Sequence, residues 1–371
     1  MVLEKKCRVF VLGMVLFMWV GCLCEGAQGQ TVPPGTPVAV PYYGAPDRFE
    51  LCGEPVPLDN QDARERFDRE FTIVVYNHAQ VYLWLKRIER YFPWIEKQLA
   101  ANGLPDDLKY LAVAESDLMT TAVSSAGAAG PWQFIPSTGS NYGLNQSRQL
   151  DERHDFEAST GSAFRYLRNL HDLFQNWALG MAAYNCGEKR VQDEIRKQKV
   201  TSYYDLKLPL ETERYIFRIL AIKEVLSHPE RYGYVLPKGA GYPPLRTDRV
   251  NVRMPNSMPI QPVAEAAGIT YRELKNLNPA LISDTVPDGS YTLKVPEGKG
   301  KEFDSRLEAL KSAGTSAGTS DTSGCIYHKV ERGETLSGIA ARYNVSSGNL
   351  KQWNNLDEDM VRIGQTLKIM H

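Results

Sequence analysis

A run of small and polar residues near the C-terminus sets the strongest limit on how this 371-residue chain can fold. Residues 312–324 consist of Ser, Gly, Thr and Ala with a single Asp. Such a segment cannot bury a hydrophobic core, so its composition predicts a flexible linker. The chain must therefore fold as separate units on either side of it, which agrees with the two or three domains expected from its length.

Charge and cysteine usage exclude some classes of function. The chain has 43 basic and 44 acidic residues, and a nucleic-acid binder usually carries a clear basic excess. Outside the leader the cysteines are scattered and show no metal-ligand spacing, so we expect no metal, no cofactor and no nucleic-acid partner. A disulfide between Cys52 and Cys186 is chemically allowed after export, but separation in sequence says nothing about geometry.

Residues 1–26 have the pattern of a signal peptide. A basic start, from Lys5 to Arg8, precedes the apolar run Val9–Val20, which is too short to cross a bilayer. The sequence before Cys22 resembles a lipobox, although Trp19 stands where Leu is usual. The leader therefore predicts export to the periplasm or cell envelope, ending either in cleavage after Gly26 or Ala27 or in an outer-membrane lipid anchor on Cys22.

The remaining chain divides by composition and periodicity. Residues 27–60 read as a Pro/Gly-rich tether, and residues 61–235 as a mainly helical domain. Two small βααβ units are expected at 246–298 and 325–371, with the linker 312–324 before the second. The helices that we expect cover 62–99 with a break near Pro93, 104–116, a start near 136, 155–173, 176–185 and 211–226. The glycine-rich residues 123–130 are expected to form a loop or short hairpin, and Thr335 and Ser346 are expected to cap helices of the last unit.

Glu115 is the first candidate for catalysis. Within its predicted helix, Leu108, Leu111 and Ala112 precede it by seven, four and three residues, so all four share one face. Burial on an apolar face raises the pKa of a carboxyl group, as a general acid requires. The alternative is a glutamate exposed to solvent at a frayed helix end, and the spacing does not decide between the two.

Three ordered motifs carry a resemblance to a known family. Glu115-Ser116 and the block 122–136 (AVSSAGAAGPWQFIP) resemble the signature of goose-type lysozymes and soluble lytic transglycosylases. Residues 183–188 (AYNCGE) and 211–215 (ETERY) resemble the second and third motifs of that family. With the lead-in 51–58 and the C-terminal unit, the chain resembles the membrane-bound lytic murein transglycosylase D type. One departure is Pro131, where Leu is commoner.

The resemblance implies a lysozyme-like helical fold and one catalytic carboxylate. Glu115 is then expected to protonate the oxygen between N-acetylmuramic acid and N-acetylglucosamine, and to accept the C6 hydroxyl proton as a 1,6-anhydro ring closes. Ordinary glycosidases use two carboxylates, and Asp117, two residues further on, does not share the face of Glu115. The alternatives are a hydrolysing muramidase and a non-enzymatic wall-binding scaffold. The expected partner is the peptidoglycan glycan strand, and we expect a monomer.

The same resemblance assigns supporting roles. Ser124 and Gln133 are expected to hydrogen-bond the sugar or to orient Glu115, and Tyr184 to bring its hydroxyl near the reacting centre, with Asn185 shaping the turn. Each has a structural alternative: a strand edge for Gln133, the core for Tyr184 and a helix cap for Asn185. Trp132 and Trp177 are expected in the core, and Glu211 in a buried polar contact.

The unit at 325–371 resembles LysM, a module that binds N-acetylglucosamine in glycan chains. The matching residues include Gly333-Glu334-Thr335-Leu336 and Trp353-Asn354. We expect the glycan groove between the turn at Gly333, Glu334, Thr335 and Leu336 and the loop that begins with Asn355. Leu336 is also a core residue by its spacing. The unit at 246–298 looks like a degenerate copy that lacks this turn, so it is expected to act as a spacer.

Overall fold

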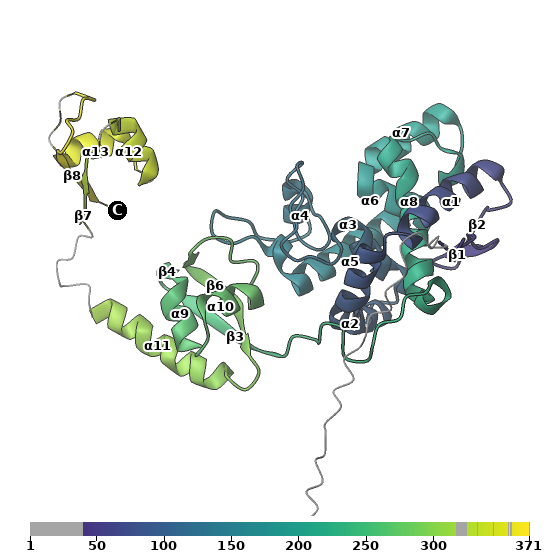
Figure 1. Cartoon of the computed structure of the whole chain (residues 1–371), viewed down its shortest axis with the longest axis horizontal. Coiled ribbons are helices and arrows are strands. Elements are labelled where there is room, and N and C mark those ends of the chain that lie inside the picture. The colour runs from purple at the N-terminus through teal and green to yellow at the C-terminus, as the bar shows by residue number, and fades with distance from the viewer. Residues whose placement is uncertain are drawn as a thin grey trace, which may run out of the picture. The chain divides into compact units, whose positions relative to one another are not determined.

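The structure is a computed structural model that describes residues 40–316, 325–331, 333–343, 345–354, 356 and 358–370. The predicted signal peptide, Cys22, most of the tether, residues 317–324 and Asn355 lie outside the described residues. The described chain comprises a helical domain, a small mixed unit and a C-terminal module, coloured purple to teal, green and yellow in Figure 1.

The helical domain begins with a short hairpin and confirms the predicted mainly α class. Its strands and α-helices are β1 (Phe49–Leu51), β2 (Glu54–Val56), α1 (Gln61–Val75), α2 (His78–Ala101), α3 (Lys109–Ser116), α4 (Pro136–Asn141), α5 (Phe156–Phe174), α6 (Trp177–Cys186), α7 (Glu188–Gln198) and α8 (Leu210–Ser227). Helix α7 was not predicted from the sequence, because its apolar face is narrow: Val191 is its single fully buried residue, and Ile195 is partly buried beside it on an otherwise charged helix.

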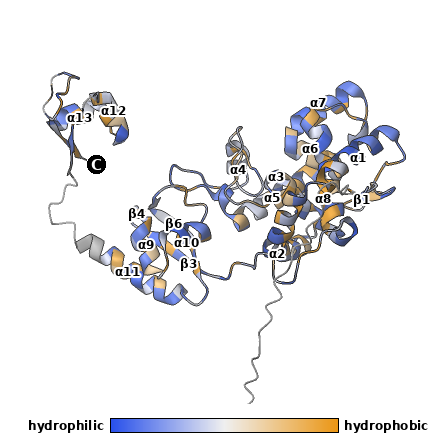
Figure 2. Cartoon of the chain, in the orientation of Figure 1, coloured by the Kyte–Doolittle hydropathy of each residue, from blue (hydrophilic) through white to orange (hydrophobic). Residues whose placement is uncertain are grey.

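Helix α8 forms the centre of this domain. Tyr215, Phe217 and Leu220 point to different sides of the helix, and each is at most 1% exposed. A helix that is buried on most sides needs neighbours all round, and α8 packs against α1, α3 and α6. Figure 2 shows the apolar colour gathered around α5 and α8, whereas α7 is mostly blue. None of the helices in the described part of the chain is both long and apolar enough to span a membrane.

The predicted helix break at Pro93 is wrong. Helix α2 runs through Pro93, and the break lies earlier, where Asn77 caps the start of α2 by accepting from Gln80 N. A proline inside a helix costs about 3 kcal/mol. Phe92, Ile95 and Leu99 are buried on both sides of it, so the packing of the apolar face outweighs the local preference.

The predicted tether extends too far. Residues 49–51 and 54–56 form the antiparallel hairpin β1–β2, and Leu51, Val56 and Leu58 are buried in the core of the helical domain. Short strands that contain Pro and Gly have a composition similar to that of a linker, so composition alone does not distinguish the two. The hairpin belongs to the helical domain rather than to the tether.

The unit after residue 246 has the predicted βααβ order. Its long strands β3 (Thr247–Met254) and β6 (Gly289–Pro296) pair antiparallel, and its other elements are β4 (Met258–Pro259), α9 (Ile260–Ala266), α10 (Tyr271–Leu277) and β5 (Thr285–Val286). Helix α11 (Gly300–Ser316) was not predicted. Phe303 and Leu307 of α11 are fully buried against this core, so the unit continues past residue 298. The helix also includes Ser312–Ser316, which the sequence assigned to the linker.

The C-terminal module repeats this order at smaller size. Strands β7 (Cys325–Lys329) and β8 (Thr366–Met370) pair antiparallel around α12 (Leu336–Arg342) and α13 (Ser347–Asn354). Both predicted helix caps are present, because Thr335 Oγ1 accepts from Gly338 N at 3.2 Å and Ser346 Oγ accepts from Asn349 N at 3.0 Å.

Candidate active site

Helix α3 presents Glu115 on its last turn. A 3₁₀ turn at Asp106–Leu108 leads into the helix, and Leu108, Leu111 and Ala112 of the predicted apolar face are fully buried. The chain then leaves the helix through left-handed backbone at Asp117, with φ of 57°. The side chain of Glu115 itself is half-buried. It is therefore neither exposed at a frayed end nor sealed in the core.

The environment of Glu115 favours its protonated form. Burial raises the pKa of its carboxyl group from 4.5 to about 7, and the negative charge of Glu211 adds to the rise. The hydrogen bond that Tyr215 donates to Glu115 Oε1 and the positive charge of Arg218 act in the opposite direction. Since burial outweighs both, Glu115 holds its proton close to neutral pH.

Asp117 is turned away from this centre. Its carboxylate accepts a hydrogen bond from Trp84 Nε1 at 2.7 Å, and its carbonyl accepts from Arg87 at 3.1 Å. Among the described carboxylates, Glu211 is the one whose charge raises the pKa of Glu115. The side chain of Glu211 is exposed. The site thus has one carboxyl group in the position of an acid, as the sequence predicts.

The glycine-rich block folds into a small loop held beside α3. Val123 bridges Ala129, and Ala129 bridges Phe134, which gives the predicted hairpin. Ser116 Oγ, next to Glu115, donates to Pro131 O at 2.8 Å. Proline lacks an N–H but keeps its carbonyl, so the unusual Pro131 still accepts this hydrogen bond from α3.

Ser124 and Gln133 both bond to the loop itself. Ser124 is exposed, and its hydroxyl accepts from Ala128 N at 3.0 Å. Gln133 has left-handed backbone, with φ of 47°, and its amide donates to Gly130 O at 2.8 Å. Neither side chain hydrogen-bonds Glu115. The prediction that they orient Glu115 directly is therefore wrong. Their contact with sugar stays a prediction.

Tyr184 lies close to Glu115. It is half-buried, and the charge of Glu115 contributes to the raised pKa of its phenol, after the larger effect of burial. Its hydroxyl donates to Trp132 O at 2.7 Å, so Tyr184 supports the glycine-rich loop. Asn185 is within the last turn of α6, whose cap is Gly187, and its Oδ1 accepts from Thr212 Oγ1 at 2.7 Å. It therefore joins α6 to α8 rather than capping a helix.

One expectation for the third motif is wrong, and one functional contact in it was missed. Glu211 is exposed and makes no buried polar contact; Glu213, two residues on, is buried and accepts from Leu208 N at 3.1 Å and Lys207 Nζ at 3.0 Å. Tyr215, which no prediction assigned a role, is the residue that hydrogen-bonds Glu115. The sequence feature that could have pointed to Tyr215 is its position at the end of the third motif, four residues after Glu211.

The remaining candidates near the site are structural. Trp132 is fully buried and donates to Thr160 Oγ1 at 2.8 Å, and Trp177 is buried with its ring stacked on His171, so the expected core positions of both are confirmed. Cys52 and Cys186 are free thiols, so they form no disulfide. The described residues contain no group of three or more His, Cys, Asp or Glu side chains placed to hold a metal ion.

The predicted glycan turn of the C-terminal module is tightly bonded. Glu334 accepts from His328 Nε2 at 2.7 Å and from Glu331 N at 2.9 Å, and it pairs with Arg342. Leu336 is buried in the core, so its side chain is not available to a sugar. Gly333 has φ of 94°, which favours glycine at this turn. Glycan binding by Gly333, Glu334, Thr335, Leu336 and Asn355 stays a prediction.

Comparison with known families matches all three units of the described chain. Residues 92–206 match the Transglycosylase SLT domain, residues 246–312 the LysM-like domain of lytic transglycosylase MltD, and residues 328–369 the LysM domain. The predicted resemblance is therefore confirmed. The MltD match includes most of α11, in agreement with the burial of Phe303 and Leu307.

The chain is also similar to individual proteins. The membrane-bound lytic murein transglycosylase D of Escherichia coli K12 is 36% identical over 299 residues, which are 76% of this chain and 64% of the relative. The chain thus spans just under two thirds of that relative's length. The cell wall-binding protein YocH of Bacillus subtilis is 43% identical over 42 residues, covering 11% of this chain and 15% of YocH. The crystal structure of the soluble lytic transglycosylase SLT70 from Escherichia coli aligns at 20% identity with a TM-score of 0.35, over 46% of this chain and 30% of that one.

Proposed function

The chain carries a transglycosylase SLT domain, an MltD-type LysM-like domain and a LysM domain, and we propose that it is a lytic transglycosylase of bacterial peptidoglycan. The observation that carries the proposal is the state of Glu115. Its pKa of about 7 leaves a substantial protonated fraction at neutral pH, which a general acid needs. A carboxyl group at its ordinary pKa would be ionised and could only act as a base.

The chemistry follows from one carboxyl group that acts twice. Glu115 gives its proton to the oxygen between N-acetylmuramic acid and N-acetylglucosamine as that C–O bond breaks. The carboxylate then takes the proton of the muramic C6 hydroxyl while that oxygen bonds to C1 and closes the 1,6-anhydro ring. The proton that Glu115 lost is thereby restored, and no water is consumed.

The hydrogen bonds of Glu115 suit this cycle. Tyr215 occupies Oε1, and Oε2 has no hydrogen-bond partner among the described residues, so Oε2 is the atom available to the sugar. When the proton leaves, the Tyr215 hydroxyl stabilises the carboxylate through a charge-assisted bond. The raised pKa of Tyr215 keeps its phenol protonated, so it remains a donor throughout.

Product analysis tests the proposal. Purified protein is incubated with isolated peptidoglycan, and the fragments are measured by mass spectrometry. A lytic transglycosylase leaves 1,6-anhydromuramic ends, whereas a hydrolysing muramidase leaves reducing ends that are heavier by one water. Absence of cleavage, with glycan binding retained, would support the non-enzymatic scaffold instead.

The location of the protein is part of the proposal. The leader pattern and the LysM module support a place in the cell envelope, with peptidoglycan as the partner. Cys22 offers a lipid anchor, and cleavage after Gly26 or Ala27 is the alternative. Membrane fractionation of the Cys22→Ser variant separates them, because only the anchored form loses its membrane association.

A further inference from the structure

The glycine-rich loop beside Glu115 is held from outside by Arg153. The Arg153 guanidinium donates through one nitrogen to Gly127 O at 2.8 Å and to Phe134 O at 2.9 Å. Gly127 lies in the turn between the bridged residues Val123 and Ala129, and Phe134 bridges Ala129 from its other side, so one side chain ties two parts of the loop 122–134 together. Arg153 is 8% exposed, and a guanidinium held this deeply makes strong charge-assisted bonds.

The backbone of Arg153 also touches the loop. A Cβ atom on Gly130 would lie 1.8 Å from Arg153 O, so only glycine permits this approach. The next residue, His154, bonds through Nδ1 to Thr120 O at 2.7 Å, just after α3 ends. Residues 153 and 154 thus contact both the loop and the segment that follows Glu115.

Asp151 aligns the guanidinium in a two-pronged ion pair. Its Oδ1 accepts from Arg153 Nε at 2.9 Å, and its Oδ2 accepts from the second terminal nitrogen at 2.6 Å. Both side chains are buried, and neither has the flexibility of a surface pair. The position of Arg153 therefore depends on where the backbone places Asp151.

The LysM-like unit holds the segment that carries Asp151. Asp151 N donates to Ala280 O at 2.8 Å, and Ile282 N donates to Gln149 O at 3.0 Å, on the two sides of a bridge between Leu150 and Leu281. Leu150 is partly buried and packs against the hydrophobic core of the LysM-like unit. Part of the catalytic domain's chain is thus incorporated into the second unit.

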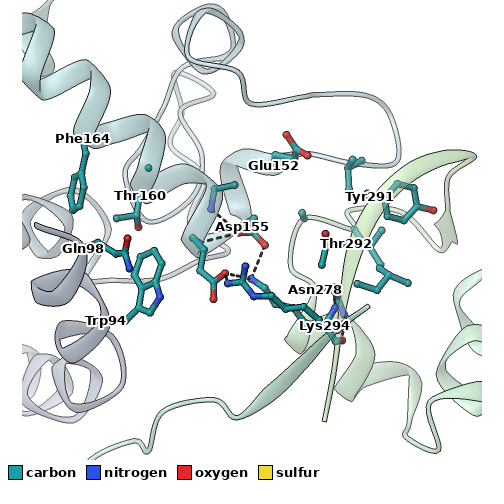
Figure 3. Close-up of a pocket in the computed structure, with 18 of the residues that line it drawn as sticks. Trp94, Gln98, Glu152, Asp155, Thr160, Phe164, Asn278, Tyr291, Thr292 and Lys294 are labelled. Carbon is teal, nitrogen blue, oxygen red and sulfur yellow. Dashed lines mark hydrogen bonds and ion pairs between the residues drawn. The ribbon is translucent and has the colours of Figure 1, made fainter. Parts of the chain in front are cut away.

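Ion pairs reinforce the same boundary. Lys294 of β6 bonds Asp155, the cap of α5, at 2.8 Å, and Arg249 of β3 pairs with Glu157. Figure 3 shows Lys294 joined to Asp155 in the wall of a cavity of about 690 Å³. Many polar groups of its wall already bond one another: Asn278, for example, bonds Leu274 O and both backbone groups of Lys294. The boundary therefore serves to hold the two units together.

We propose that Arg153 is a positioning residue of the transglycosylase site and that the LysM-like unit is part of its support, because it holds Asp151. This inference rests on the proposed function for its activity readout. Its structural readout, the hydrogen exchange of the loop 122–134, does not depend on the reaction. The LysM-like unit is then a component of the catalytic domain rather than the spacer that the sequence predicts.

The first test is Arg153→Ala in the full chain. We expect faster amide exchange across 122–134 and a fall in kcat of about 100-fold, with KM changed much less, because misplacement of catalytic groups mainly costs the chemical step. Added guanidinium, well below denaturing concentration, should restore part of the activity. Arg148→Ala is the matched control, since Arg148 is exposed in the same segment.

The outcomes separate a positioning role from a merely structural one. Unchanged loop exchange and kcat in Arg153→Ala would overturn the inference, as would a uniform loss of stability without guanidinium rescue. If the parent chain cleaves nothing, the proposed function fails, while faster exchange of the loop would still support the role of Arg153.

The second test addresses the LysM-like unit through Lys294→Ala. Faster exchange in 145–155 and 122–134, with a several-fold fall in kcat, is the expected result. Lys299→Ala is the control, because Lys299 pairs only with Glu302 inside its own unit. If Lys294→Ala alters exchange in β6 alone and leaves kcat equal to the control, the LysM-like unit is not part of the support.

Discussion

Two glutamates at helix ends, one in the catalytic domain and one in the LysM module, have opposite electrostatic environments. Glu115 is on the last turn of α3, where burial raises its pKa to about 7. Glu334 lies just before α12, where the Glu331 N–H and then His328 lower its pKa below 4.5. The same residue type thus gives a protonated acid near neutral pH at one helix end and an ionised carboxylate at the other.

The difference shows what each carboxyl group is arranged to do. Both carboxylate oxygens of Glu334 bind groups of the LysM module itself, so Glu334 stabilises its own turn. Glu115 has one tyrosine partner and keeps the other oxygen available. A carboxyl group that is buried and has few hydrogen-bond partners lowers the stability of the folded state, but it is well suited to transfer a proton. The following predictions test this contrast, beginning with the largest expected effect.

Glu115→Gln should abolish the reaction while leaving glycan binding intact. Glutamine keeps the shape and an acceptor for Tyr215 but has no proton to transfer. Because general acid catalysis contributes up to about 10⁴-fold, we expect kcat/KM to fall by about 10³-fold or more. The measurement is release of anhydro fragments, with binding to sacculi followed by co-sedimentation.

Glu334→Gln is the matched control for that experiment. It should leave cleavage of short, soluble glycans at the level of the parent chain, because the residue acts within the LysM module. A similar loss of cleavage in both variants would contradict the distinction between the two glutamates. Full activity in Glu115→Gln would remove the basis of the proposed mechanism.

The two glutamates should also change stability in opposite directions. For Glu115 the folded pKa is about 7 and the ordinary value is 4.5, so between these values the folded state binds more protons than the unfolded state. Its charge therefore lowers the free energy of unfolding as pH rises through this window. Glu115→Gln should be more stable than the parent by up to about 3 kcal/mol above pH 7, from 1.36 kcal/mol per pKa unit, and about equal near pH 4.

Glu334 provides the opposite sign. Its lowered pKa means that its stabilisation is present above pH 4.5 and is lost as pH falls through the folded value. Glu334→Gln should therefore destabilise the LysM module at neutral pH. Denaturant unfolding at pH 5 and pH 8, followed by tryptophan fluorescence, measures both variants. A stabilised Glu115→Gln protein at pH 5 but not at pH 8 would contradict the assigned pKa.

The sequence predicted the contrast only in part. The spacing of Leu108, Leu111 and Ala112 placed Glu115 on an apolar face, and the caps at Thr335 and Ser346 followed from local chemistry. These features are determined within one or two helical turns, so periodicity and capping rules suffice.

The missed features depend on contacts between distant residues. Tyr215 meets Glu115 across 100 positions, and helix α2 continues through Pro93 because of tertiary packing. Arg153 reaches Gly127 from a segment whose position depends on the LysM-like unit. No local pattern contains such information. In the mostly polar helix α7, a narrow apolar face made by Val191 and Ile195 gives only a short local signal.

Removing the LysM module should weaken wall binding and leave the chemistry unchanged. Because α11 continues to Ser316, the truncated chain should end there rather than at residue 311. We expect affinity for sacculi to fall by about tenfold or more as one of two linked binding sites is lost. Cleavage of short glycans should be unaffected, and equal sedimentation with sacculi would argue against a binding role for the module.

Tyr215→Phe should produce the smallest and most specific effect. The hydroxyl of Tyr215 stabilises the charged form of Glu115, so its removal raises the pKa of Glu115 further above 7. The fall of kcat/KM on the alkaline side of its pH profile (the alkaline limb) should move to higher pH. We also expect a several-fold loss of kcat, because the Glu115 carboxylate formed by proton transfer is less stabilised.

Tyr203→Phe is the control, since Tyr203 also bonds α8 in the core, through Thr212 O and Glu213 O, without touching Glu115. It should lower stability and leave the alkaline limb in place. A shift of that limb to lower pH in Tyr215→Phe would show that the tyrosine favours the protonated acid, and the contrast between Glu115 and Glu334 would then need a different electrostatic basis.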